Sequence, residues 1–243
     1  MKLIKLMFWS GIISVSLFCI SCTKDDDENE DKLPEGQIVM KITPNWNNNV
    51  YFELIAQTVT VDWGDGNIES LTPQDGWIAL WHEYANRNIK TVTMKTSGLT
   101  YLDVGINHSG IIYELSLGKC PKLSYLDCLN NQLTNLDVSK NTALTELRCY
   151  YNQITSLDVS KNTALALLYC HHNQITSLDV SKNIALIELR CFNNQLTATA
   201  LNTLFNSLPI KTPPVYSFMY ISNNPGADAC DKSIAENRGW RVF

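Results

Sequence analysis

The chain lacks the sequence signatures of the common enzyme classes. Its 243 residues contain no nucleophile elbow, no phosphate-binding loop, no spaced set of metal ligands and no pair of carboxylates in a pocket-like context. The formal net charge of −5 gives no reason to expect a nucleic acid partner. We therefore expect a protein that is not an enzyme and that uses neither a metal nor a cofactor.

Cysteine is also scarce relative to what a disulfide scaffold needs, because eight cysteines in a chain of this length do not define a small cross-linked domain. Four of the eight recur every 21 residues, namely Cys128, Cys149, Cys170 and Cys191. We interpret them as a row of inward-facing thiols rather than as disulfides or metal ligands, since free cysteine behaves as a small buried apolar residue.

The apolar run at the N-terminus, Leu6 to Ile20, has only fifteen residues and is too short to span a membrane. Lys2 and Lys5 precede it, which predicts a secretory signal over residues 1–21. The run ends in Cys-Ile-Ser-Cys, which resembles the lipobox of bacterial lipoproteins, although a cysteine stands where that family usually has leucine. The resemblance implies lipidation of Cys22, with a membrane anchor as the result. The alternative is an ordinary cleaved signal with an incidental cysteine.

Residues 22–35 form an acidic segment that is typical of a solvated, disordered tether. Its Lys-Asp-Asp-Asp string directly after Cys22 also resembles the export signal of Bacteroidetes surface lipoproteins. That resemblance implies an outer-membrane protein exposed on the cell surface. The alternative is an anchor that faces the periplasm.

Residues 36–98 show the period-two alternation of half-buried strands, for example over residues 37–43 and 58–63. The string VDWGDG, with a later His-Glu-Tyr and a Thr-Val-Thr strand, resembles the PKD type of immunoglobulin-like domain. The resemblance implies a small β-sandwich over residues 36–98 that acts as a spacer. Asp62 and Asp65 are interpreted as turn residues within it.

The rest of the chain repeats a unit of 21 residues, L-x-x-L-x-C-x-x-N-x-L-T-x-L-D-V-S-x-N, beginning at Leu123, Leu144 and Leu165. A half unit follows from Leu186, and a weaker copy precedes from Leu99. The unit resembles the internalin-like leucine-rich repeat, which implies a right-handed solenoid over residues 99–243. Each unit then contributes one short strand, and successive strands stack in parallel about 4.8 Å apart.

Two further patterns belong to the solenoid. The asparagine column, Asn131, Asn152, Asn173 and Asn194, is expected to bond to backbone groups where the chain turns off each strand. Apolar residues at Leu201, Leu204, Phe205 and Leu208 predict an amphipathic helix, and a last helix is expected with Asp228 as its N-cap. Together they predict a short α-helical C-terminal cap.

The variable outward positions of the repeat are the candidate ligand-binding residues, because tyrosine, phenylalanine and arginine are enriched at recognition hot spots. They are Arg148, Tyr150, Tyr151, Tyr169, His171, His172, Arg190 and Phe192. His171 is expected to point away from the core that holds Cys170, so that the two cannot share a metal. The alternative is that duplication copied these side chains and that no ligand contacts them.

The sequence thus predicts a mainly β protein with a small sandwich, a solenoid and a helical cap. We expect a non-catalytic, surface-anchored binding or adhesion module for a protein or glycan ligand. The alternatives are a structural or assembly component of the envelope and a glycan-binding accessory of a polysaccharide-uptake system.

Overall fold

The computed structural model describes residues 33–45, 47–105, 111–212 and 217–243. The predicted signal peptide, Cys22 and most of the acidic tether lie outside the described residues. Within the described ranges, no helix is long and apolar enough to cross a membrane.

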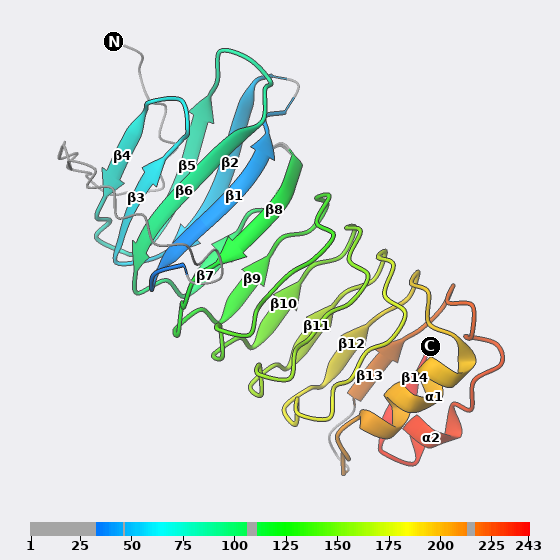
Figure 1. The fold of residues 1–243 in the computed structure, drawn as a ribbon. Coiled ribbons are helices and arrows are strands. Elements are labelled where there is room, and N and C mark those ends of the chain that lie inside the picture. The colour runs from blue at the N-terminus through cyan, green and yellow to red at the C-terminus, as the bar shows by residue number, and fades with distance from the viewer. Residues whose placement is uncertain (1–32, 46, 106–110, 213–216) are drawn as a thin grey trace.

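The N-terminal part is built from antiparallel strands in two layers (Figure 1). One layer is a five-stranded sheet in the order β4-β3-β6-β1-β8, and the other begins with the pair β2 and β5. The strands are β1 Gln37–Thr43, β2 Asn49–Ile55, β3 Thr58–Asp62, β4 Ile68–Leu71, β5 Trp77–Glu83, β6 Lys90–Ser97 and β8 Ile111–Leu117. Alternate side chains point inward, as the period-two pattern predicted for β1 and β3.

The contact between Phe52 on β2 and Trp63 after β3, with ring centroids 6.1 Å apart, joins the two layers. Asp62 and Asp65 both cap the turn that follows, since their carboxylates accept hydrogen bonds from the backbone amides of Gly64 and Asn67 at 2.9 and 3.1 Å. This turn role confirms the interpretation of the two aspartates, while the resemblance to a PKD domain stays a prediction.

The repeats form a β-solenoid whose short strands stack in parallel and in register (Figure 1). The strands are β7 Tyr101–Asp103, β9 Tyr125–Asp127, β10 Glu146–Arg148, β11 Leu167–Tyr169, β12 Glu188–Arg190, β13 Ser217–Tyr220 and β14 Trp240–Val242. Strand β7 also pairs with β2, so the solenoid sheet continues into the N-terminal layer as one nine-stranded sheet. Strand β8, which lies in the first coil between β7 and β9, pairs with β1 in the other layer. The two parts of the chain therefore share both sheets.

The repeated leucine, cysteine and valine columns fill the solenoid core. Cys128, Cys149, Cys170 and Cys191 are all buried and none of them is in a disulfide, as predicted. Burial raises the pKa of the Cys170 thiol to about 12, which keeps it protonated and unreactive at neutral pH.

Two asparagine columns hold successive coils together. The Asn152 amide nitrogen donates to the carbonyls of Cys128 and Cys149 at 3.0 and 3.1 Å, while its oxygen accepts from the Leu133 amide at 3.0 Å. The predicted role of this column is therefore confirmed. A second column, Asn141, Asn162 and Asn183, was given no role from the sequence although its side chains are fully buried. The Asn162 amide donates to the Val138 and Asn141 carbonyls of the preceding coil at 3.0 and 2.9 Å.

Two helices lie at the C-terminal end of the solenoid (Figure 1). The helix α1, Ala198–Ser207, buries Leu201, Leu204 and Phe205 as its periodicity predicted. The second helix, α2, covers only Ser233–Glu236 and begins after Lys232, so the predicted N-cap at Asp228 is wrong. Residues 224–230 instead close their own turns, for example between the Cys230 amide and the Gly226 carbonyl at 3.0 Å. A capping function for the two helices stays a prediction.

Candidate ligand-binding face

The outward side chains of the nine-stranded sheet form one continuous surface, which we call the ligand face. Because the strands are in register, residues at equivalent positions of successive coils lie side by side. The central row of the ligand face consists of Asp103, Asp127, Arg148, Tyr169, Arg190 and Tyr220. All eight candidate residues predicted from the sequence lie on this face, on β10–β12 or within three residues after these strands.

Both arginines of the ligand face lie between tyrosine rings. The Arg148 guanidinium is 5.3 Å from the ring centroid of Tyr125 and 5.5 Å from that of Tyr169. The Arg190 guanidinium is 4.6 Å from Tyr169 and 5.3 Å from Tyr220. These distances are within the range of favourable cation–π contacts. From Arg148 to Tyr220 the central row therefore alternates cations and rings, and Tyr125 of the neighbouring row covers the other side of Arg148.

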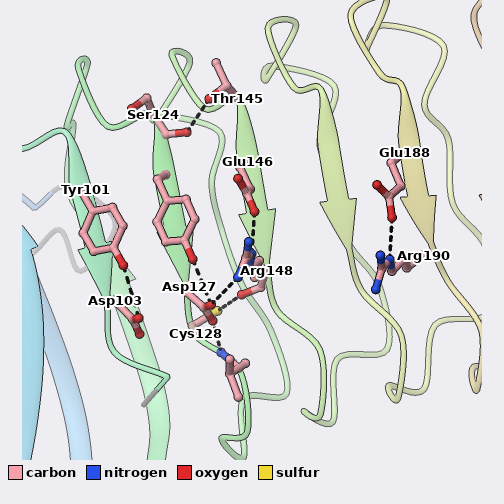
Figure 2. A network of polar contacts seen from close by, with 12 residues as sticks. Tyr101, Asp103, Ser124, Asp127, Cys128, Thr145, Glu146, Arg148, Glu188 and Arg190 are labelled. Atoms are coloured by element: carbon pink, nitrogen blue, oxygen red, sulfur yellow. Dashed lines mark hydrogen bonds and ion pairs between the residues drawn. The ribbon is translucent and has the colours of Figure 1, made fainter. Parts of the chain in front are cut away.

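A glutamate two residues upstream on the same strand holds each arginine in place. The Nε atom of Arg148 donates to Glu146 at 2.5 Å, and that of Arg190 donates to Glu188 at 2.6 Å (Figure 2). Each pair is formally neutral, and each guanidinium is fixed by both a carboxylate and its flanking rings. Such fixed side chains lose little conformational entropy when a ligand binds them.

A second row of rings runs beside the central one. The centroids of Tyr150 and His171 are 4.4 Å apart, and those of His171 and Phe192 are 4.3 Å apart, all in stacked geometry. The neighbours of His171 leave it only 8% exposed, and its expected orientation away from the core stays a prediction. Burial, with smaller contributions from His172 and Arg190, lowers the pKa of His171 to about 4. His171 is therefore a neutral, packed ring at neutral pH.

The residue that follows each ring of this row has a left-handed backbone. Tyr151 and His172 both have φ of 54°, and their rings stack with centroids 4.1 Å apart. The equivalent residues of the other coils are Asn130, Asn193 and Asn223, also with positive φ. Asparagine tolerates this conformation well and histidine better than most residues, whereas a bulky residue such as tyrosine is strained in it. Tyr151 is also the most open of the candidate residues, at 49% exposure.

The N-terminal end of the ligand face is acidic. Glu53 of β2 is paired in register with Asp103, and Asp103 with Asp127. Burial raises the pKa of Asp127 to about 6, and the charge of Asp103 adds to the rise. Asp127 is only 2% exposed and accepts a hydrogen bond from the Leu129 amide at 2.9 Å.

This acidic end was missed from the sequence, because Glu53 meets Asp103 only through the pairing of β2 with β7. Periodicity within the repeat carries no signal for a partner strand 50 residues upstream. Another polar column, Asp137, Asp158 and Asp179, caps turns, since each carboxylate accepts from a serine amide two residues later at 2.8 Å. Among the described residues, no group of histidine, cysteine, aspartate or glutamate side chains is arranged to hold a metal ion.

Comparison with known proteins finds no matching family model and no matching curated protein. Solved structures with similarity include the functional domain of InlJ from Listeria monocytogenes, which has a cysteine ladder. It is 34% identical over 57% of this chain and 33% of that chain, with a TM-score of 0.41. A leucine-rich repeat protein of Leptospira interrogans is 22% identical over 51% of this chain and 31% of that one, with a TM-score of 0.40. An internalin, InlF of Listeria monocytogenes, is 19% identical over 59% and 46% of the two chains, with a TM-score of 0.41. The chain thus spans less than half the length of each of these proteins.

Proposed function

We propose that this protein is a non-catalytic binding module and that its ligand face docks a protein or glycan ligand. The observation that carries the proposal is the left-handed backbone of Tyr151 and His172 in the middle of the face. Strain of this kind persists where the surrounding structure imposes it, and it is concentrated at functional sites.

The chemistry of the face supports the same function. Tyrosine, histidine, phenylalanine and arginine side chains lie on the middle three strands, β10–β12, and at the second and third residues after these strands. Their packing against one another fixes their positions before a ligand arrives, which reduces the entropic cost of binding. Aromatic and arginine side chains of this type dominate the energetics of protein interfaces.

A glycan is the second candidate ligand, and the open ring of Tyr151 favours it. An exposed aromatic ring can pack against the apolar face of a sugar, while Glu188 and Arg190, two coils further along the same face, offer a carboxylate and a guanidinium to sugar hydroxyls. On this reading the protein is a glycan-binding accessory of an uptake system. A role as a structural or assembly component of the envelope is the remaining alternative.

We further propose the location from the sequence: a lipid anchor on Cys22, an acidic tether over residues 22–35 and exposure at the surface of the outer membrane. The PKD-like part, residues 36–98, would then act as the spacer. Replacement of Asp25, Asp26, Asp27 and Glu28 by alanine should keep the protein in the membrane but protect it from external protease. Unchanged protease access in this variant would contradict surface export by this signal.

The double variant Tyr150→Ala plus His171→Ala tests the function. It removes two stacked rings of the face while the buried leucine, cysteine and asparagine columns stay intact. We expect this variant to lose ligands that the wild-type protein captures on a glycan array or by crosslinking to partners on intact cells. The matched control is Thr155→Ala plus Thr176→Ala, which changes two exposed side chains on the coil segments after the asparagine turns. If the ring variant retains the ligand, the binding site lies elsewhere.

A further inference from the structure

The acidic end of the ligand face is a row of three carboxylates from neighbouring strands. Glu53, Asp103 and Asp127 are register partners, and Arg148 is the next residue in the same row. Neighbouring strands are about 4.8 Å apart, so the three carboxylates lie close to one another. Each is two residues from a tyrosine of its own strand, namely Tyr51, Tyr101 and Tyr125.

The charge of this row is not balanced within the described part of the chain. Neither Glu53 nor Asp103 has an ion-pair partner there. Arg148 donates to Glu146 at 2.5 Å and approaches Asp127 only to 3.9 Å. Burial and then the charge of Glu53 raise the pKa of Asp103, even though the Gly105 amide donates to it. A cation placed here would relieve a repulsion that the charge of Arg148 compensates only in part.

Aromatic rings border the same carboxylates. The rings of Tyr101 and Tyr125 are stacked with centroids 4.4 Å apart, and Trp77 lies 5.4 Å beyond Tyr101. The Tyr101 hydroxyl points toward the Asp103 carboxylate at 3.5 Å (Figure 2), and the Tyr125 hydroxyl toward Asp127 at 3.3 Å. A group that binds here would meet both negative charge and the faces or edges of rings.

The middle of the ligand face already shows which group fits this combination. Arg148 and Arg190 each lie between two tyrosine rings and pair with one carboxylate. Beside Asp103 the row offers a tyrosine pair and carboxylates, but the chain supplies no arginine there. The planar guanidinium suits this arrangement better than an ammonium group, because it pairs bidentately with carboxylates and stacks on rings.

We propose that the acidic end of the ligand face docks a partner protein by accepting an arginine side chain of that partner between Tyr101, Glu53 and Asp103. The inference rests on the proposed binding function and specifies the ligand as a basic protein segment. Charge complementarity favours this occupant over a glycan, since neutral and acidic glycans bring no cation to the row. The arginine would pair with carboxylates beside the stacked rings of Tyr101 and Tyr125, as Arg148 and Arg190 pair with Glu146 and Glu188 beside their own tyrosines.

The test compares short fluorescein-labelled glycine–serine peptides that carry two arginines, two citrullines or two glutamates. Citrulline keeps the shape of arginine without its charge. By fluorescence anisotropy with the full chain, we expect the arginine peptide to bind and the citrulline peptide to bind about tenfold more weakly, as for the loss of a hydrogen bond to a charged group. The glutamate peptide should not bind. Equal binding of the arginine and citrulline peptides, or binding of neither, would overturn the proposal.

Variants of the protein test where on the ligand face the arginine peptide binds. Glu53→Gln and Asp103→Asn keep the shape of each side chain, and the asparagine can still accept from the Gly105 amide. Each substitution should lower the affinity for the arginine peptide about tenfold. The control Asp228→Asn removes one exposed carboxylate from the C-terminal segment and should leave binding unchanged. A similar loss in Asp228→Asn would show that only the overall charge matters, and would overturn the site.

The outcome can be separated from that of the proposed function. The ring variant, Tyr150→Ala plus His171→Ala, tests the middle of the ligand face and leaves the acidic end intact. If ligands are lost in the ring variant but the arginine peptide does not bind, the binding function holds and the arginine site is wrong. Glycan binding that depends on Asp103 would likewise assign this end to a sugar and overturn the arginine site.

Discussion

The replacement of Tyr151 by asparagine should make the protein more stable, although it removes an aromatic ring from a stack. Tyr151 has φ of 54°, and the equivalent residues Asn130 and Asn193 have φ of 55° and 51°. A left-handed backbone costs most L-residues roughly 1–2 kcal/mol, and asparagine less because its side chain bonds locally. The substitution therefore relieves strain without moving the backbone.

The opposing effect is the loss of the ring contacts of Tyr151, of which the stack on His172, with centroids 4.1 Å apart, is closer than the contacts with Tyr150 and His171 at 5.8 and 6.1 Å. A ring pair contributes about 0.5–1.5 kcal/mol, and the half-exposed position of Tyr151 favours the low end. The new amide can also approach His172 as Asn193 does on the other side, at 3.0 Å. The net expectation is a gain of about 0.5–1 kcal/mol in the free energy of unfolding.

Urea denaturation followed by circular dichroism measures the change, and an unchanged dependence on urea would show that the unfolded state is unaltered. The matched control is Tyr150→Asn, since Tyr150 has no left-handed backbone to relieve and stacks on His171 at 4.4 Å. It should lose about 1–2 kcal/mol. The reverse change, Asn130→Tyr, should also destabilise the protein, because it introduces the strain.

A Tyr151→Asn variant that is less stable by 1 kcal/mol or more would refute the reasoning. The ring would then be present because it stabilises the coil, and its strained backbone would no longer indicate a ligand. A variant that is more stable but binds the ligand less well would show that Tyr151 is retained at a cost to stability.

Three further predictions concern the core and the acidic end. Asn162→Ala should lower the free energy of unfolding, measured by urea denaturation, by about 2–4 kcal/mol, because two buried carbonyls lose their donor. The control Asn135→Ala, at an exposed position, should leave that free energy nearly unchanged. Cys149→Ser places a hydroxyl at a fully buried position and should lower the free energy of unfolding by about 1–3 kcal/mol. Cys149→Ala should lower it less, because alanine leaves no unsatisfied hydroxyl, and equal losses would show that side-chain volume alone matters. Folding raises the pKa of Asp127 from an ordinary 3.8 to about 6, so the stabilising contribution of its protonated form is full below 3.8 and is lost as pH rises through about 6. Asp127→Asn should therefore be more stable than wild type by about 1–3 kcal/mol at neutral pH, with the difference shrinking toward pH 4; no difference at neutral pH would contradict the raised pKa.

Much of the solenoid could be predicted from the sequence because its contacts repeat. The asparagine at 152 bonds to the carbonyl of Cys128 in the coil before, and the same spacing recurs in each unit, so one column of letters reports one kind of contact. The N-terminal layer lacks that redundancy. Strand β2 was not identified, and its pairing with β5 and β7 depends on residues far apart in the chain. Glu53 could not be placed on the ligand face without that pairing.

The burial of His171 could not be predicted for a different reason. Alternation along the strand tells which side a residue faces, but its exposure depends on the neighbours above and below it in the stack. Tyr150 and Phe192 happen to be large and flat, and together they cover the imidazole. The left-handed backbone at Tyr151, by contrast, had a signal in the sequence: asparagine occupies the equivalent position in the coils that contain Asn130 and Asn193.

The left-handed position also helps to decide whether duplication alone explains the rings of Tyr151 and His172. Copying a unit preserves its residues, and asparagine, which tolerates a left-handed backbone, is present at Asn130, Asn193 and Asn223. Two adjacent coils instead have tyrosine and histidine at this position, both less favourable there than asparagine, and the two rings stack on each other. Duplication supplies no reason for a departure that weakens the fold at neighbouring positions of one surface. A ligand that contacts Tyr151 and His172 supplies one, which is why the most informative test of function is a substitution that should improve stability.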